Sequence, residues 1–146
     1  PGETLDQTWE TVALNIEAKP TLGLGNIFVP FPSLELTQYA MEHGHVTPEA
    51  VANPPKDYAA KSILNIPAAH AQQLRRILCL FPMFVRFPAL FRRAGLRSFL
   101  MRLPLPLLRV TYEMAYVWMF ASLYKVRTPL AARIPMLARY IRNLFP

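Results

Sequence analysis

An α/β segment followed by an all-α C-terminal region is the fold class that the sequence predicts. Residues 27–31 are a short apolar run, rich in β-forming residues and closed by Pro30 and Pro32. This pattern is typical of a parallel strand that is covered on both faces. From about Ile66 onward the apolar residues instead recur at helical spacing. The sequence therefore predicts two parts that are built differently.

The first predicted element is a helix that starts beside Thr4. Thr4 and Gln7 have the S/T-x-x-E/Q spacing of a capping box, in which each side chain bonds to a backbone N–H near the other. We expect this helix to run to about Ala18 and to end at Lys19 and Pro20.

The predicted strand at residues 27–31 leads directly into a second helix. Ser33 offers an N-cap hydroxyl, and Glu35 lies close to the positive end of the helix. Gly44, after His43, is the predicted left-handed cap at the other end. A lone parallel strand has no partner for its ladder. We therefore expect the chain to belong to a longer protein, and its exposed strand edge to make it poorly soluble alone.

Two sequence signatures lie within residues 1–44. The first is Pro1-Gly2-Glu3-Thr4-Leu5, followed by Glu10-Thr11, Leu14-Asn15 and Lys19-Pro20. The second is Ile27-Phe28-Val29-Pro30-Phe31-Pro32-Ser33-Leu34-Glu35-Leu36, followed by Tyr39-Ala40 and Glu42-His43-Gly44. Together they resemble radical SAM enzymes, and more closely the subfamily that carries a cobalamin-binding domain ahead of the radical SAM barrel.

The resemblance implies that residues 1–45 are the last βα units of a partial TIM-like barrel. In that family a Gly-Leu-Pro-Gly-Glu-Thr turn follows the fifth barrel strand, and a Pro-x-Pro-Gly-Thr-Glu-Leu segment follows the sixth. This sequence has Ser33-Leu34 where the family has Gly-Thr, so its turn is made without glycine. The family's Cys-x3-Cys-x2-Cys motif is absent, since Cys79 is the single cysteine.

The resemblance also implies a cofactor site. In the family a [4Fe-4S] cluster reduces S-adenosylmethionine (SAM) to a deoxyadenosyl radical, and the parent protein would also bind cobalamin. This chain alone is expected to bind none of them, and no residue is assigned a catalytic role. The residues that match the two SAM-side segments, and are expected to contact SAM mainly through their backbone, are Pro1, Gly2, Glu3, Phe28, Val29 and Pro30. Glu3 fits a helix-capping role equally well.

A proline-rich connector at residues 46–65 is predicted before a basic helical region at residues 66–146. Pro54 and Pro55 bar regular helix in the connector, although Pro48 can open one short turn. In the helical region we expect breaks at Pro82, Pro88 and Ala94-Gly95, two short basic helices across residues 84–102, and a longer helix across residues 106–127. A last helix places Ile134, Leu137, Ala138 and Ile141 on one side.

The helix predicted at residues 106–127 is apolar nearly all round. Eleven residues separate Glu113 from Lys125, whereas a membrane span needs about twenty. We therefore expect a helix that is buried or lies in an interface, with Arg109 able to pair with Glu113 at i, i+4.

Charge is divided unevenly along the chain. Residues 1–74 contain three lysines and eight acids, a net charge of −5, whereas residues 75–146 contain twelve arginines and Lys125 against Glu113, a net charge of +12. One interpretation is a solvated helical face with arginine stems covering the core. A second is contact with an anionic membrane surface, helped by neighbouring aromatic residues. Nucleic acid is least favoured, because no nucleic-acid module is present.

Histidine and cysteine are two further residue types that can carry chemistry. His43 and His45 have the spacing of a metal-binding pair, but the other histidine, His70, lies across the connector, so no metal site is predicted. His43 is expected to contact the carboxyl end of its helix instead. Cys79 lies in an apolar helical pattern and is expected to be a core residue.

Three hypotheses for function follow. The first is the C-terminal portion of a cobalamin-type radical SAM enzyme, which contributes the SAM-side wall and a helical cap. The parent would methylate or rearrange a lipophilic substrate in the reducing cytoplasm, and this portion would be inactive without the rest of the parent chain. The second is a helical module that binds a membrane surface or partner without catalysis. The third is an independent small α/β domain.

Overall fold

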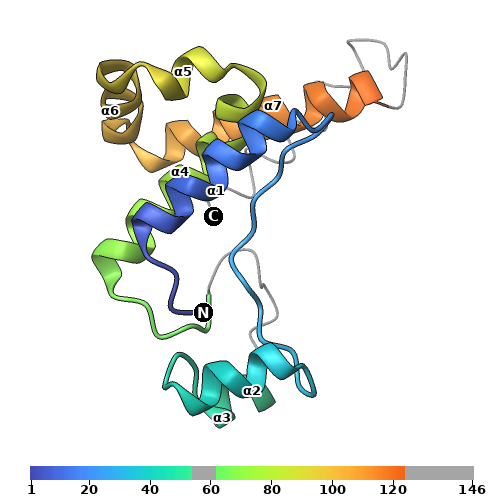
Figure 1. The fold of residues 1–146 in the computed structure, drawn as a ribbon, viewed down its shortest axis with the longest axis vertical. Helices are drawn as coiled ribbons and strands as arrows, with labels where there is room; N and C mark the ends of the chain where they lie inside the picture. Colours follow the sequence, from blue (N-terminus) through green and yellow to red (C-terminus); the bar gives the residue numbers. More distant parts are fainter. Residues whose placement is uncertain (54–61, 124–146) are drawn as a thin grey trace.

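The computed structural model describes residues 1–53 and 62–123, which form helices joined by turns and extended loops (Figure 1). In chain order the helices are α1 (Leu5–Ala18), α2 (Glu35–Glu42), α3 (Pro48–Ala52), α4 (Ala68–Arg86), α5 (Pro88–Arg92), α6 (Ala94–Arg102) and α7 (Leu105–Leu123). No strand occurs in these described residues. The prediction of an α/β fold, with residues 1–45 as βα units of a TIM-like barrel, is therefore wrong for this chain.

The predicted strand at residues 27–31 is part of an extended loop. Just before this segment, at Gly25, the backbone of the loop lies close to α4. A Cβ placed on Gly25 would be 2.8 Å from Cδ2 of Leu78. Within the described residues, no backbone hydrogen bond joins residues 22–30 to another extended segment. A strand exists only through its ladder of hydrogen bonds. Strand-like patterning therefore produces extended backbone here without a sheet.

Helix α1 forms as the sequence predicts. Thr4 is its N-cap: the backbone N–H of Gln7 donates to Oγ1 of Thr4 at 3.3 Å, and the backbone N–H of Thr4 donates to Oε1 of Gln7 at 2.8 Å. Ala18 is the last helical residue, and Lys19 ends the helix in the left-handed conformation, with φ 49°. The predicted capping box and both helix ends are confirmed.

The turn before α2 differs from the prediction. Leu34, not Ser33, is the N-cap of α2, and it makes no side-chain capping bond. Ser33 instead has φ 73°, a left-handed conformation that glycine adopts at lower cost. The left-handed turn places Ser33 one residue too early to cap the helix.

Helices α2 and α3 form a small unit with its own core. Gly44 has the predicted left-handed conformation, with φ 70°. Thr47 then caps α3, which begins at Pro48 and is the short turn expected in the connector. The buried residues Ala40, Val46 and Val51 form the centre of this unit.

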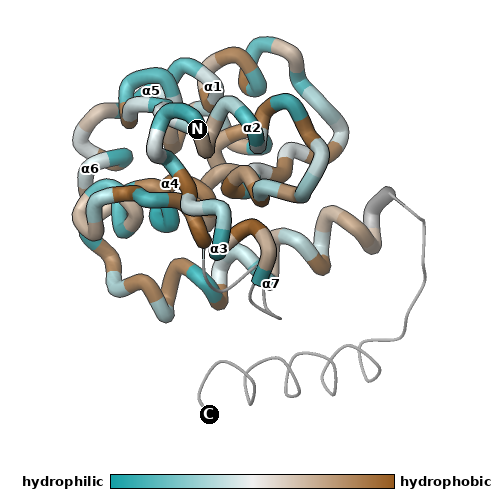
Figure 2. Tube along the Cα trace, turned by 90° about the horizontal axis from the view of Figure 1, so that it is seen from below, coloured by the Kyte–Doolittle hydropathy of each residue, from teal (hydrophilic) through white to brown (hydrophobic). Residues whose placement is uncertain are grey.

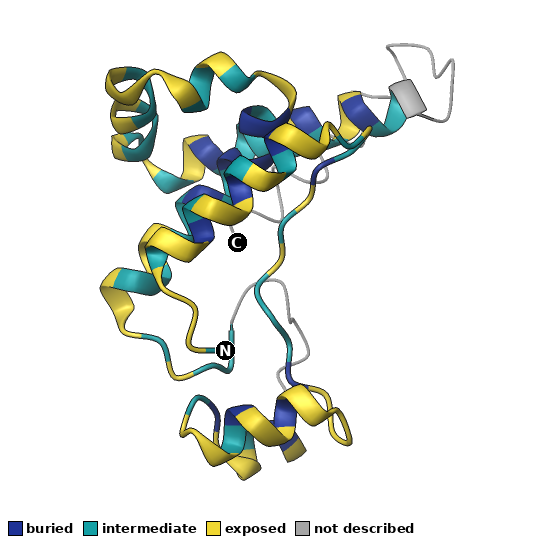
Figure 3. Ribbon diagram, in the orientation of Figure 1, coloured by how far each residue is buried: buried dark blue, intermediate teal, exposed yellow. Residues whose placement is uncertain are grey.

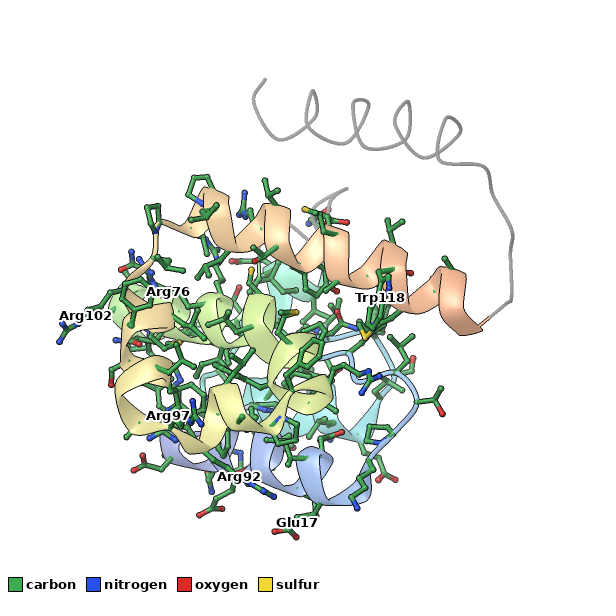
Figure 4. The ribbon with its side chains drawn as sticks, turned by 90° about the horizontal axis from the view of Figure 1, so that it is seen from above. Glu17, Arg76, Arg92, Arg97, Arg102 and Trp118 are labelled. Carbon is green, nitrogen blue, oxygen red and sulfur yellow. The ribbon has the colours of Figure 1, made fainter. Side chains whose placement is uncertain are left out.

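Helix α4 is the central helix of the larger core, with α1 on one side and α7 on the other (Figures 1 and 4). Burial is concentrated where these three helices meet (Figure 3). Phe84 of α4 has no exposed surface. The other buried residues of this core are Val12, Ile16, Ile77, Leu80, Phe81, Val85 and Leu108.

Pro82 lies inside α4, so the predicted break at this residue is wrong. A proline in a helix interior removes one hydrogen bond and costs about 3 kcal/mol or more. Pro82 is fully buried in this structure. Packing of α4 between α1 and α7 outweighs the backbone penalty, and the helix continues to Arg86.

Helices α5 and α6 are the two short basic helices predicted across residues 84–102, although α4 takes the first part of that range. Ala94 begins α6 instead of ending a helix, because the extended backbone of Arg93 already supplies the break. Nη1 of Arg76 donates to the carbonyl oxygen of Met101 at 2.9 Å and to that of Leu103. These bonds tie the end of α6 to α4.

Helix α7 starts at Leu105, close to the predicted start, and carries apolar residues along most of its length (Figure 2). Among the helices of the described ranges, none has the length and apolar character that a membrane crossing requires. The predicted helix around Ile134, Leu137, Ala138 and Ile141 lies outside the described residues, as does part of the predicted connector, residues 54–61.

Candidate functional site

A cavity of about 620 Å³ lies between the start of the chain, the extended loop and α4. One wall is formed by residues 1–6 with the first turns of α1, and another by residues 24–28. Residues 64–67 and half-buried or buried residues of α4 complete the lining. The cavity thus brings together residues from the ranges 1–15, 24–28 and 64–81, and also His45.

The residues expected to contact SAM divide into two groups. Pro1, Gly2, Glu3 and Phe28 all line the cavity. Val29 and Pro30 do not line it, and Pro30 is fully buried. The structure therefore places the first signature and the beginning of the second at one site.

His45 closes the cavity beside Gly2. Gly2 has φ 77°, and a Cβ placed on it would lie 2.9 Å from Nε2 of His45. Asn65 fixes the turn that carries His45, because its backbone N–H donates to the carbonyl oxygen of His45 at 2.7 Å. Only a residue without a side chain allows the imidazole to lie so close to the start of the chain.

His45 is a site residue that sequence reasoning missed. The His-x-His spacing drew attention to metal binding, whereas the structure uses His45 as part of the cavity wall. His70 also lines the cavity, at the start of α4. No local pattern in the sequence announces either role, because each depends on where a distant segment folds.

Tyr39, His43 and His45 form a short aromatic stack next to the cavity. The ring centroids of Tyr39 and His43 are 3.9 Å apart, and those of His43 and His45 are 6.3 Å apart. Nδ1 of His43 lies 2.9 Å from the carbonyl oxygen of Tyr39 and donates to it. The predicted contact of His43 with the carboxyl end of its helix is confirmed. In the part of the chain that the structure describes, no group of three or more His, Cys, Asp or Glu residues is arranged to hold a metal.

The cavity has an apolar wall and a polar rim. Leu74, Leu78 and Phe81 of α4 face the cavity together with Phe28. The exposed residues Glu3, Asp6 and Asn26 place carboxylate and amide groups in the same lining. Such a site suits a ligand with an aromatic or aliphatic part and a cationic or hydrogen-bonding part.

Cys79 lies away from this cavity, at the α4–α7 contact. Burial raises the pKa of the Cys79 thiol; Arg109 lowers the pKa and Glu113 raises it, each by a smaller amount. Burial also raises the pKa of the Glu113 carboxyl. Arg109 and Glu113, predicted as an i, i+4 pair, form no ion pair in the described structure. Cys79 packs against the main core, as predicted.

No family model, curated protein or solved structure matches this chain.

Proposed function

We propose that this chain is the C-terminal portion of a cobalamin-type radical SAM enzyme. Residues around the cavity would border SAM, and the helices from α4 onward would form a cap beside it. One observation carries this proposal: Gly2 and Phe28, which belong to the two family-like signatures, line the same cavity although 25 residues separate them.

The lining of the cavity is compatible with SAM. The carboxylates of Glu3 and Asp6 offer negative charge to a sulfonium cation and hydrogen-bond acceptors to an ammonium group, and Phe28 offers a ring face to a purine or a cation. Gly2 lets the backbone approach a ligand closely. These groups bind and orient, and none of them is assigned a proton-transfer role.

The residues of this chain do not fit an iron–sulfur cluster, because such clusters are held by several cysteines and Cys79 is the only one present. In the proposed protein the cluster and cobalamin would be held by the rest of the parent chain. The proposal places the parent in the cytoplasm, at the inner face of the membrane, with a lipophilic substrate that it methylates or rearranges.

The decisive experiment uses the full parent reading frame that contains this chain. The protein is expressed without oxygen and its cluster is reconstituted, and formation of 5′-deoxyadenosine from SAM is measured. Glu3→Gln and Phe28→Ala are each expected to raise KM for SAM by about tenfold, since a lost charge-assisted hydrogen bond or a lost ring contact is worth about 1.5 kcal/mol.

Glu17→Gln is the matched control, because Glu17 is exposed on α1 and lies outside the cavity lining. It should leave KM for SAM unchanged. A parent frame without a Cys-x3-Cys-x2-Cys segment would end the proposal. The proposal would also fail if the protein with its reconstituted cluster formed no 5′-deoxyadenosine, or if Glu3→Gln, Phe28→Ala and Glu17→Gln all had the same KM for SAM.

A further inference from the structure

We propose that the outer face of α7 docks on the surface of an anionic membrane. This face, called the α7 face below, consists of the exposed residues Leu107, Met114, Val117 and Trp118, with Arg102 just before the helix, Arg86 beside Trp118, and Phe87 in contact with Arg86. The proposal concerns a partner, and it does not depend on SAM chemistry.

Four exposed apolar side chains share one side of α7. Leu107 and Met114 are seven residues apart, and Val117 and Trp118 follow Met114 by three and four residues, so they occupy one side of a helix. Met114 is 56% exposed and Trp118 is 48% exposed.

The opposite side of α7 already has a partner. Leu108, Ala115 and Met119 are buried, and α7 packs on α4. Burial against the core therefore explains one apolar side of the helix and does not account for the exposed side chains of Leu107, Met114 and Val117. A helix that is apolar on both sides is typical of a second apolar environment.

The charge of the helical region, together with Arg86 beside Trp118 and Arg102 by the start of α7, favours an anionic occupant. Residues 68–123 contain eight arginines and one acid, Glu113, a net charge of +7. A second copy of this chain would bring the same positive charge to the contact and would be repelled. Nucleic acid would satisfy the arginines, but it would leave Leu107, Met114 and Val117 exposed to water. An anionic bilayer surface satisfies both the arginines and the apolar side chains.

Arg86 joins the charged and apolar parts of the face. Its guanidinium carbon lies 5.6 Å from the ring centroid of Phe87 and 5.8 Å from that of Trp118. Arg102 lies by the start of α7 and Trp118 toward its other end (Figure 4). Arginine next to tryptophan suits the boundary between headgroups and acyl chains, where the guanidinium meets phosphate and the ring meets hydrocarbon.

The test measures sedimentation of the purified chain with phosphatidylcholine vesicles, with and without phosphatidylglycerol. Binding is expected with phosphatidylglycerol only, and it should weaken as salt shortens the Debye length from about 10 Å at 0.1 M to about 3 Å at 1 M. Arg86→Gln and Arg102→Gln should each weaken binding about fivefold, and Met114→Glu about tenfold. In a Trp9→Phe background, emission of Trp118 should shift to the blue when vesicles are added.

Two matched controls lie in α1 and at its C-cap, on the other side of α4 (Figure 4). Leu14→Glu places a carboxylate on an apolar residue that is 65% exposed, and Lys19→Gln removes one positive charge. Both should bind vesicles like the unaltered chain, with far-UV circular dichroism confirming that all variants are folded.

Several outcomes overturn the proposal. One is no binding to phosphatidylglycerol vesicles; another is equal loss of binding in the α1 and α7 variants. Tighter binding to a single-stranded oligonucleotide than to vesicles would assign the arginines to nucleic acid. A dimer that Met114→Glu dissociates, without any change in vesicle binding, would assign the α7 face to self-association.

Discussion

Nε2 of His45 lies only 2.9 Å from the position that a Cβ on Gly2 would occupy. Gly2 stands at the start of the chain and His45 follows α2, so the contact joins two segments that the sequence separates widely. The ring of His45 is at the end of its side chain and can rotate away. An added methyl group should therefore displace the imidazole without unfolding the protein.

Gly2→Ala is the first prediction. Both Gly2 and Gly44 have positive φ, but a Cβ on Gly44 would meet no atom within 4 Å. Alanine at either position should lower the free energy of unfolding by about 1–2 kcal/mol, the cost of a left-handed backbone. Only Gly2→Ala should change the NMR shifts of the His45 ring, and only Gly2→Ala should raise KM for SAM in the parent enzyme.

The Gly44→Ala variant separates backbone strain from crowding. Equal displacement of His45 in both variants would show that strain in the turn, and not the methyl group on Gly2, moves the ring. An unchanged His45 ring in Gly2→Ala would show that the close contact is not kept in solution.

Ser33→Gly should stabilise the protein. Ser33 has φ 73°, a conformation that costs a residue with a Cβ about 1–2 kcal/mol relative to glycine. Glycine also has more conformational freedom in the unfolded chain, which offsets part of the stability gained by the substitution. We expect a net gain of about 0.5–1 kcal/mol in urea unfolding. Ser98→Gly, at an exposed position inside α6, is the control and should lose about 0.5 kcal/mol. A loss in both variants would contradict the strained turn.

Local signals in the sequence predicted local structure well. The capping box of Thr4 and Gln7 and the left-handed Gly44 were predictable because each depends on a few neighbouring residues. Residues 27–31 misled because a strand depends on hydrogen bonds to another segment, and none of the described segments provides them. Pro82 misled for a related reason, since burial between α1 and α7 keeps α4 continuous.

The candidate site was predictable only in part. Pro1, Gly2, Glu3 and Phe28 were singled out from a resemblance and do line the cavity. His45 and His70 were not assigned to it, because their places depend on how distant segments meet. The sequence positions of two residues say little about whether their segments will be in contact in the folded protein.

Phe84→Ala should be strongly destabilising. Phe84 has no exposed surface, and its ring lies 6.1 Å from that of Trp9 and 5.8 Å from that of Phe91, measured between centroids. Removing it takes away buried apolar surface and leaves a cavity where α1, α4 and α5 meet, so we expect a loss of about 3–5 kcal/mol. Phe99→Ala, at a residue that is 60% exposed, should change the free energy of unfolding by less than about 1 kcal/mol. Similar losses would mean that the core is not centred on Phe84.

Glu113 gives the protein a defined pH dependence. Burial raises the pKa of its carboxyl above the ordinary value of 4.5, so the folded state binds this proton more tightly than the unfolded state does. The stability that this group contributes is complete below about pH 4.5 and is lost as the pH rises through the folded-state pKa. Glu113→Gln removes that loss, because glutamine stays neutral. The melting temperature of the variant minus that of the original chain should therefore increase as the pH is raised from 4 to 7.

Glu17→Gln, on the exposed surface of α1, is the control for this pH dependence, because it reports what the loss of one carboxylate does through net charge alone. Subtracting the change in melting temperature of Glu17→Gln from that of Glu113→Gln leaves the part that is due to the burial of Glu113. If the corrected difference stays constant or decreases between pH 4 and pH 7, Glu113 is not held in a desolvated position beside α4. The packing of α7 described above would then be incorrect at that residue.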